Sequence, residues 1–287
     1  MAQGLFEPRR GDLAPGDRCV AGADWSDFTV EPIRTIDHPL FATTYRRLWS
    51  EFGASGGMER REVIAERMRW DPARPVSGHA FLYEMLAVHR SGEVVALMDH
   101  TVILPAGADM HLVVHLSHVL VEPSMRGRGL AAWLRALPLQ TARECAARAG
   151  RPLPDRITLV AEMDMEIGGN APPARIRSFA RAGFRTVDPR RVRYAQPDFR
   201  APADIDRTGV QPLPLALVLR RVGREDETSM SGRELRDVAA TLYAMYAEHV
   251  RRDHMAPAVS LIDDYPLPDE EVALLPLLDA WKCGARA

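Results

Sequence analysis

The stretch Leu116-Ser-His-Val-Leu-Val-Glu-Pro-Ser-Met-Arg-Gly-Arg-Gly-Leu-Ala-Ala-Trp-Leu134 decides how the rest of this chain is interpreted. It begins as an apolar strand, Pro123 interrupts the strand, and two glycines precede an apolar segment with helical spacing. Glycine lets the backbone turn tightly and approach a ligand closely, because no Cβ is in the way. The first amides of a helix have no partner within it, so this turn predicts a phosphate site. Arg126 and Arg128 add positive charge beside it, which favours a diphosphate.

Hydrophobic patterns on both sides of this turn predict a mixed α/β fold. Before the turn we expect a strand, two helices and then three strands in an antiparallel meander, at 28–36, 37–52, 59–70, 80–89, 94–103 and 111–121. After it we expect helices and strands in turn, at 129–149 (helix, interrupted at Pro138), 157–163 (strand), 174–182 (helix), 184–187 and 215–222 (strands), and 231–253 and 269–281 (helices).

The composition is that of a globular protein. Hydrophobic residues make up 46% of the chain and charged residues 26%, which excludes wholesale disorder. Residues 1–25 are rich in Pro, Gly, Asp and Arg and predict a loose N-terminal arm. The composition changes again near Gly223, so we expect one domain over 26–222 and a helical C-terminal extension over 223–287.

Charge and cysteine usage exclude several classes of protein. Lys plus Arg number 37 and Asp plus Glu 39, so the formal charge of −2 argues against nucleic-acid binding by bulk charge. Cys19, Cys145 and Cys283 are far apart, which excludes a disulfide framework and a thiolate zinc site and fits a reducing compartment. We find neither an apolar run of roughly 18 residues nor the apolar core of a signal peptide. The sequence therefore predicts a cytoplasmic protein with no bound metal and with neither nucleic acid nor membrane as a partner.

Three kinds of phosphate site could use such a turn. A P-loop requires a lysine that is absent here. The spacing Gly127-x-Gly129-x-x-Ala132 fits a dinucleotide site formally, but Glu162 and Asp164 come too late to bind its ribose. An antiparallel meander before the turn also disagrees with a doubly wound parallel sheet. A dinucleotide-binding oxidoreductase therefore stays as the weaker alternative.

The third kind fits better. Residues 121–131, Val-x-Pro-x-x-Arg-Gly-Arg-Gly-Leu-Ala, resemble the acyl-CoA-binding motif of the GNAT superfamily of N-acetyltransferases, whose core is Arg/Gln-x-x-Gly-x-Gly/Ala. Residues 178–184, Ser-Phe-Ala-Arg-Ala-Gly-Phe, are similar to the helix-to-strand segment of that family, and the order of elements agrees over residues 28–222. The resemblance implies a GNAT-type α/β fold, with a mixed, mostly antiparallel central sheet flanked by helices. It also implies acetyl-CoA as co-substrate and direct acetyl transfer to an amine.

The resemblance assigns the coenzyme-binding residues position by position. The backbone of Val119, Leu120 and Val121 would pair with the pantetheine arm like an added strand. Asn170 resembles an asparagine near the start of a later helix, although it stands two residues earlier than in the family. The diphosphate would be held by the turn and the first helical residues, namely Arg126, Gly127, Arg128, Gly129, Leu130, Ala131 and Ala132.

Acetyl transfer needs a base for the ammonium and an acid for the thiolate. The family often has a glutamate on the strand after the diphosphate helix. Glu162 matches it, with Asp164 as the alternative. His115 on the preceding strand could relay a proton at neutral pH. The alternative to catalysis is a structural, hydrogen-bonded role for His115 and a position at a solvated strand end for Glu162. Where the family commonly has a tyrosine as acid, this chain has Phe179, so Tyr194 is the candidate substitute.

Several alternatives stay open at this point. Phe179 favours a catalytically silent acyl-CoA-binding or sensor module as a rival to the enzyme. The acceptor is a small-molecule or peptide amine that the sequence does not identify, and the oligomeric state is open, with a homodimer as one option. Glu84 and Asp99, on the paired strands before the motif, either receive a cationic substrate or belong to ordinary strand surface.

Overall fold

The computed structural model describes residues 9–107, 111–165 and 172–284, and the chain divides into two compact units. Unit 1 comprises Met1–Ala106 and Val114–Leu153, and unit 2 comprises Gly107–Val113 and Pro154–Ala287. Of the helices within the described ranges, none combines the length and the apolar character needed to cross a bilayer.

The sheet of unit 1 has the strand order β1-β2-β3-β4. Its strands are β1 (Phe28–Ile33), β2 (His79–Arg90), β3 (Glu93–Pro105) and the part of β4 (His111–Val121) from Val114 onward. β1 pairs with β2 and β2 with β3, both antiparallel. Ser91 and Gly92 join β2 to β3 with φ of 52° and 83°, because a two-residue turn that matches the strand twist needs positive φ at both positions. The predicted hairpin is confirmed.

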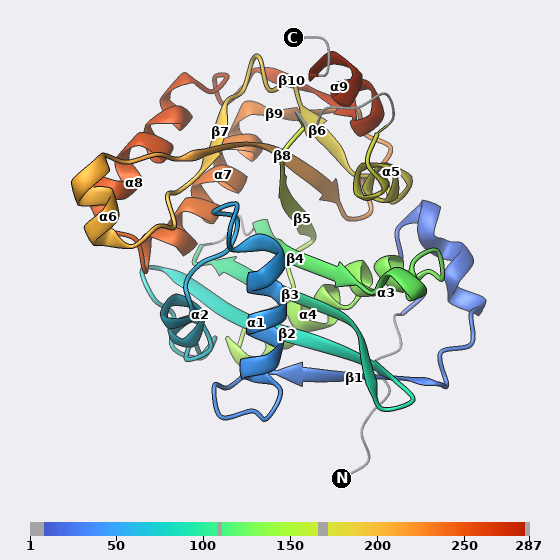
Figure 1. The fold of residues 1–287 in the computed structure, drawn as a ribbon. Coiled ribbons are helices and arrows are strands. Elements are labelled where there is room, and N and C mark those ends of the chain that lie inside the picture. The colour runs from blue at the N-terminus through green and yellow to red at the C-terminus, as the bar shows by residue number, and fades with distance from the viewer. Residues whose placement is uncertain (1–8, 108–110, 166–171, 285–287) are drawn as a thin grey trace. The chain divides into compact units, whose positions relative to one another are not determined.

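Helices cover both faces of this sheet (Figure 1). α1 (Phe41–Phe52) and α2 (Arg61–Arg67) pack on one face, and α4 (Pro138–Arg148) packs against β2 and β3 on the other. α3 (Leu130–Ala136) leads directly into α4, and the chain is interrupted at Pro138 as predicted, since proline cannot donate the next helical hydrogen bond.

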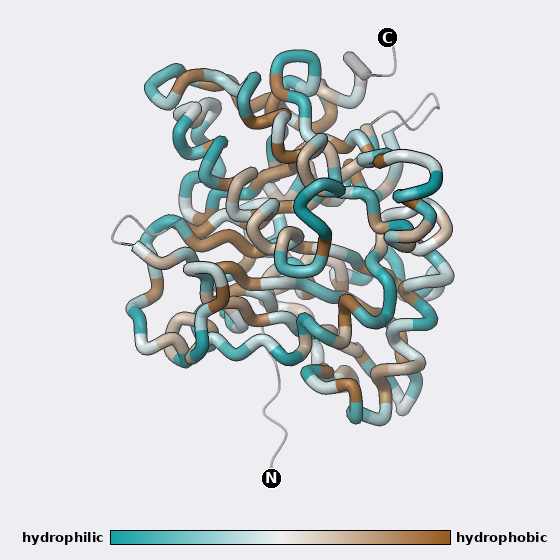
Figure 2. The backbone as a smooth tube through the Cα atoms, turned by 90° about the vertical axis from the view of Figure 1, so that its left-hand side faces the viewer, coloured by the Kyte–Doolittle hydropathy of each residue, from teal (hydrophilic) through white to brown (hydrophobic). Residues whose placement is uncertain are grey.

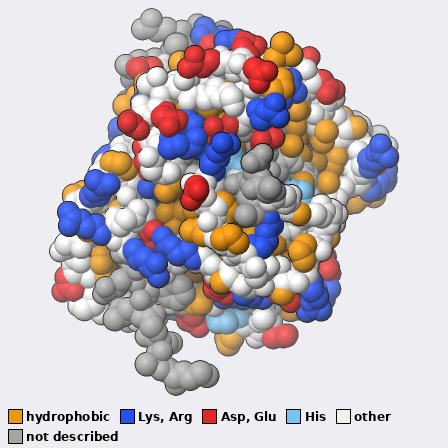
Figure 3. All heavy atoms as spheres, turned by 180° about the vertical axis from the view of Figure 1, so that it is seen from behind, with side chains coloured by type: hydrophobic (Ala, Val, Ile, Leu, Met, Phe, Trp, Pro, Cys, Tyr) orange, Lys and Arg blue, Asp and Glu red, His pale blue; other side chains and the backbone are white. Residues whose placement is uncertain are grey.

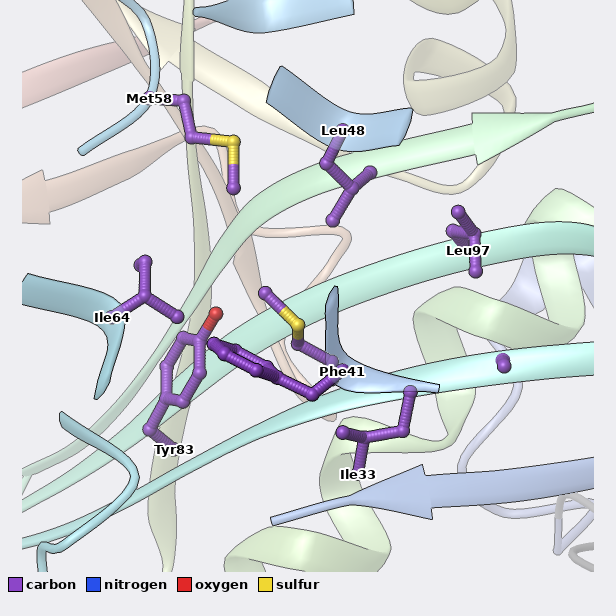
Figure 4. Packing of buried hydrophobic residues seen from close by; sticks show 9 residues of the cluster. Ile33, Phe41, Leu48, Met58, Ile64, Tyr83 and Leu97 are labelled. Atoms are coloured by element: carbon purple, nitrogen blue, oxygen red, sulfur yellow. The ribbon is translucent and has the colours of Figure 1, made fainter. Parts of the chain in front are cut away.

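Side chains from β1, β2, β3, α1, α2 and the loop between α1 and α2 form the hydrophobic core on the α1 face (Figure 4). The strands contribute alternate residues, as the two-residue period of a strand requires. This core consists of Ile33, Phe41, Leu48, Met58, Ile64, Tyr83, Met85, Ala87 and Leu97.

The segment before β1 is folded onto unit 1, whereas composition predicted a loose arm over residues 1–25. It contains the 3₁₀ helix η1 (Pro15–Gly22), and Trp25 stacks on Trp133 of α3 with ring centroids 4.9 Å apart. Asp17 lies 2.7 Å from Arg135, and both side chains are at most 3% exposed. The difference arises because each partner on α3 lies more than a hundred residues away in the sequence, where a local composition cannot indicate it. Residues 1–8 lie outside the described part of the chain.

The sheet of unit 2 has the order β5-β8-β6-β10-β9, with β7 paired to β8. The pairs β5–β8, β6–β8, β6–β10, β9–β10 and β7–β8 are all antiparallel. The strands are β5 (Arg156–Met163), β6 (Arg185–Val187), β7 (Tyr194–Gln196), β8 (Leu213–Arg221), β9 (Ser229–Ser231) and β10 (Glu271–Pro276). The helices are α5 (Ala174–Arg181), α6 (Pro202–Thr208), α7 (Gly232–Ala247), α8 (Arg252–Val259) and α9 (Leu277–Gly284). Stretches of hydrophobic residues, drawn in brown, alternate along the chain with hydrophilic ones, drawn in teal (Figure 2).

A mixed α/β fold with a mostly antiparallel sheet flanked by helices is thus confirmed. α7 begins as predicted, because the Ser231 hydroxyl accepts a hydrogen bond from the Glu234 amide. Two strands were missed in residues 223–287: β9, and β10, whose residues 271–276 were expected to be helical. β10 pairs with β6, a partner distant in sequence, and this pairing outweighs the helical pattern.

Candidate functional site

The glycine turn, residues 126–131, connects the end of β4 to the start of α3. A short 3₁₀ helix, η2 (Pro123–Met125), follows β4. Gly127 and Gly129 then have φ of 78° and 89°, a left-handed conformation that residues with a Cβ rarely adopt. The sequence pattern of the turn therefore reflects a real backbone requirement at these two positions.

Backbone amides in the glycine turn are free to bind a ligand. The amides of Met125 and Arg126 donate to the carbonyls of Glu122 and Pro123, and the Ala132 amide donates to the Gly129 carbonyl 2.9 Å away. Between them, no acceptor in the described part of the chain takes a hydrogen bond from the five successive amides of residues 127–131. Residues 126–128 are exposed, and Gly129 and Ala131 are half-buried. Leu130, the remaining residue of the run, is buried. A run of N–H groups without a partner suits an anion with several oxygens.

Two arginines of the glycine turn lie close to these amides in sequence. The Arg126 guanidinium donates through Nε to the Val121 carbonyl 3.1 Å away, which holds its side chain back along the end of β4. Both Arg126 and Arg128 are exposed, and neither has an acidic partner among the residues that the structure describes. Their charge therefore adds to the attraction of the amides for an anion.

The N-terminal segment supports the glycine turn from behind. A Cβ placed on Gly129 would lie 2.7 Å from Cγ1 of Val20 in η1, whereas a Cβ on Gly127 would meet nothing within 4 Å. Gly129 is therefore required both for its backbone conformation and for close packing. Gly127 is required for its conformation alone and borders open space.

Val119, Leu120 and Val121, the expected partners of the pantetheine arm, are the last residues of β4 and are half-buried. Leu120 packs against the hydrophobic core of unit 1. These residues lead directly into the glycine turn. Their pairing with the coenzyme stays a prediction.

His118 on β4 is buried and charged. Its Nδ1 lies 2.8 Å from a carboxylate oxygen of Asp99, and its Nε2 lies 2.9 Å from the Gly57 carbonyl. Both neighbours only accept hydrogen bonds, so both ring nitrogens carry protons. Burial alone would lower the pKa of His118, but the charge and hydrogen bond of Asp99 outweigh it and raise the pKa to about 9.

His115 lies on the opposite face of β4 from His118, as the strand period predicts. Its ring is buried, and Nδ1 lies 3.2 Å from the Ser117 hydroxyl. His115 belongs to unit 1, whereas Glu162 and Tyr194 belong to unit 2. A proton-relay role for His115 stays a prediction.

Unit 2 brings together Glu162 and Tyr194, two residues singled out from the sequence. The Tyr194 hydroxyl donates to Oε1 of Glu162 at 2.5 Å, and the Tyr246 hydroxyl donates to Oε2 at 2.6 Å. Burial, and then the charge of Glu162, raise the pKa of Tyr194 well above its usual value. Tyr246 was missed as a site residue. The available signal was a phenol on the buried face of the 231–253 helix, because a buried hydroxyl needs a hydrogen-bond partner.

Aromatic packing holds the rings of Tyr194 and Tyr246 in place. The rings of Tyr194 and Tyr243 stack at 5.3 Å, and the Tyr243 hydroxyl donates to the Ala195 carbonyl. The ring of Phe199 packs against Tyr246 at 5.4 Å. The phenols of Tyr194 and Tyr246 are therefore held toward the Glu162 carboxylate rather than free to rotate.

Two further positions from the sequence analysis, Asp164 and Phe179, lie in the described part of the chain. Asp164 is exposed, and its backbone carbonyl accepts a hydrogen bond from Arg175. Phe179 packs edge-on against Phe184 with centroids 4.7 Å apart and offers no proton. Asn170 lies outside the described residues.

The structure supports neither expectation for Glu84 and Asp99: they are not exposed on the strand surface, and their carboxylates are not open to a cationic substrate. Glu84 is fully buried and binds Arg34 at 2.6 Å and the Thr141 hydroxyl at 2.5 Å. Asp99 is 1% exposed and accepts hydrogen bonds from His118 and Tyr83. Both carboxylates thus have partners within unit 1.

One acidic cluster has the spacing of a metal site. Asp206, Asp253 and His254 place one ligand atom each within 4.8 Å of one another. However, the guanidinium of Arg251 donates to both aspartates, at 2.8 and 2.5 Å, and so already supplies their positive partner. On the face shown in Figure 3, basic side chains (blue) also lie among acidic ones (red).

Comparison with known proteins finds similar folds only among solved structures. No family profile and no curated protein matches the chain. A GNAT family acetyltransferase from Elizabethkingia anophelis with acetyl-CoA bound is 12% identical; the match covers 68% of this chain and 98% of that one, with a TM-score of 0.36. Arabidopsis thaliana NAA60 in complex with acetyl-CoA is 14% identical, with 68% and 99% covered and a TM-score of 0.36. The aminoglycoside acetyltransferase meta-AAC0020 from an uncultured soil metagenomic sample is 11% identical, with 48% and 79% covered and a TM-score of 0.32.

Proposed function

We propose that this protein is an acetyl-CoA-dependent N-acetyltransferase of the GNAT type that acts on a small-molecule or peptide amine. The observation that supports this most directly is the run of unpartnered amides at residues 127–131, in a turn that also carries the side chains of Arg126 and Arg128. These amides occupy the positions at which the sequence resembles the acyl-CoA-binding motif.

The glycine turn would hold the coenzyme by its diphosphate. Phosphate oxygens accept hydrogen bonds from the successive amides, and charge-assisted hydrogen bonds of this kind are roughly twice as strong as neutral ones. Arg126 and Arg128 contribute charge from the exposed side of the turn. The backbone of Val119, Leu120 and Val121 pairs with the amides of the pantetheine arm.

The reaction forms a bond between the acceptor nitrogen and the acetyl carbonyl carbon, and breaks the bond between that carbon and the coenzyme sulfur. The acceptor ammonium first loses a proton. The Glu162 carboxylate is the group proposed to take it, because a carboxylate can accept a proton and has none to donate. The departing thiolate then takes up one proton, so that charge balances. Tyr194 and His115 are the candidates for that second transfer.

Two measurements test the proposal. Titration calorimetry should show binding of acetyl-CoA and no binding of NADH, and an assay of free thiol should show coenzyme release with at least one amine of a panel of aminoglycosides, polyamines, amino acids and peptides. Binding of NADH without acetyl-CoA would reject the assignment.

A second candidate is a coenzyme-binding module without catalysis. Phe179 supports it, because this position packs on Phe184 and carries no hydroxyl to protonate a thiolate. Tight binding of acetyl-CoA without turnover on any amine of the panel would favour this candidate over the enzyme.

A further inference from the structure

Glu162 is held at both carboxylate oxygens by phenols from two separate elements. Tyr194 on β7 binds Oε1, and Tyr246, from α7 in the C-terminal part of the chain, binds Oε2. The three residues are 32 and 84 positions apart in sequence and all belong to unit 2. Tyr246 is 1% exposed, so water does not compete readily for its hydroxyl.

Two donors on opposite oxygens restrict how the carboxylate can turn. Rotation of the carboxyl group about its Cγ–Cδ bond would break both hydrogen bonds at once. Both phenols donate, so they favour the charged form of the carboxylate, which only accepts hydrogen bonds. A base held in one orientation and kept deprotonated is suited to remove a proton from an ammonium.

We propose that Tyr246 is a positioning residue for catalysis: it orients Glu162 and keeps it in the carboxylate form. This inference rests on the proposed acetyltransferase function and gives α7 a part in it. Tyr246 acts through Glu162 and not on the substrate. Its removal therefore changes how Glu162 titrates and leaves coenzyme binding unchanged.

α7 supplies a matched control. Tyr243 is also buried, at 3% exposure, and its hydroxyl also donates one hydrogen bond, but to the Ala195 carbonyl at 3.0 Å instead of to Glu162. The variants Y243F and Y246F each remove one buried phenol oxygen from the same helix. A general effect of losing such a bond appears in both variants, and an effect on Glu162 appears in Y246F alone.

The kinetic experiment compares the pH profiles of kcat/KM for the amine in wild type, Y243F and Y246F. In Y246F we expect kcat at neutral pH to fall roughly tenfold, the equivalent of one hydrogen bond to a charged group. We expect the acid limb of the profile to move to higher pH, with KM for acetyl-CoA unchanged. Y194F should shift the acid limb in the same direction, since it removes the donor of the other oxygen. Equal profiles for Y246F and Y243F would overturn the proposal.

A second readout does not depend on activity. In protein labelled with ¹³C at glutamate carboxyl groups, the Glu162 signal is assigned by its loss in E162Q and titrated in each folded variant. A higher midpoint in Y246F than in wild type and Y243F is the expected result, and unchanged midpoints contradict it. If the midpoint moves but no amine is acetylated, the acetyltransferase assignment fails while the hold on Glu162 stands.

Discussion

His118 donates a hydrogen bond to Asp99 across 2.8 Å within the sheet of unit 1, and both side chains are buried. Tyr83 donates to the other oxygen of Asp99, and the second nitrogen of His118 donates to the Gly57 carbonyl. The pair therefore ties β4, on which the expected pantetheine partners lie, to β3 and to the loop between α1 and α2.

This pair predicts a loss of stability at alkaline pH. The pKa of His118 is about 9 in the folded protein and about 6.5 when unfolded, so its contribution is complete below pH 6.5 and is lost as the pH rises through 9. Urea unfolding between pH 6 and pH 10 should show the free energy of unfolding falling over that window. The variant H118Q should lose most of this pH dependence, and an unchanged slope would show that the pair is not responsible.

Removing the charge of Asp99 should lower the free energy of unfolding more than removing an exposed charge does. Burial by itself raises the pKa of Asp99, but His118 and the hydrogen bonds hold it below its usual value, so Asp99 is charged at neutral pH. In D99N burial lowers the pKa of His118, so the ring loses its proton at pH 7 and the contribution of the charged pair is lost; we expect about 3 kcal/mol less stability at pH 7. Thermal or urea unfolding measures this loss of stability. The control is R190A, which removes the exposed Arg190 from its ion pair with Asp188. A similar small effect in both variants would contradict the buried charge.

The two glycines of the turn should respond differently to alanine. At Gly127 the new Cβ meets no atom within 4 Å, so G127A pays mainly for its positive φ, about 1 kcal/mol. At Gly129 the new Cβ meets Val20 at 2.7 Å, so G129A should be less stable than G127A, with partial recovery in the double variant G129A/V20A. Chemical denaturation compares the variants.

Coenzyme binding should depend on the open side of the same turn. A valine at Gly127 projects into the space where we place the diphosphate, so G127V should weaken acetyl-CoA binding by at least about tenfold, or 1.4 kcal/mol. Calorimetry on folded protein measures it. Coenzyme affinity equal to wild type in G127V would remove the main support for the proposed function.

The N-terminal segment should be necessary for the stability of unit 1. Asp17 and Arg135 form a buried ion pair at 2.7 Å, so D17N leaves Arg135 without its carboxylate. We expect a loss of about 3 kcal/mol by denaturant unfolding. The neighbouring exposed residue Arg18 provides the control R18A, which should stay within about 0.5 kcal/mol of wild type. Equal stability of D17N and R18A would mean that the segment contributes little.

Local patterns predicted the elements that depend on near neighbours. The β2–β3 hairpin at Ser91 and Gly92, the interruption at Pro138 and the Ser231 cap of α7 are each decided by a few adjacent residues. The same holds for the glycine turn, whose left-handed φ values follow from the residue type. β10 was missed because a strand of six residues exists only through its pairing with β6 and β9.

The sequence by itself determined the turn that we assign to the coenzyme, because residue type and short spacing carry that information; Glu162 and Tyr194 were chosen from the resemblance to the GNAT superfamily. Only the tertiary structure decided that Tyr194 and Tyr246 hold Glu162, that Asp99 pairs with His118, and that Asp17 and Val20 belong to unit 1. Each of these contacts joins residues that are 19 or more positions apart. Burial makes a polar group find a partner, but which partner it finds depends on where the folded backbone places both.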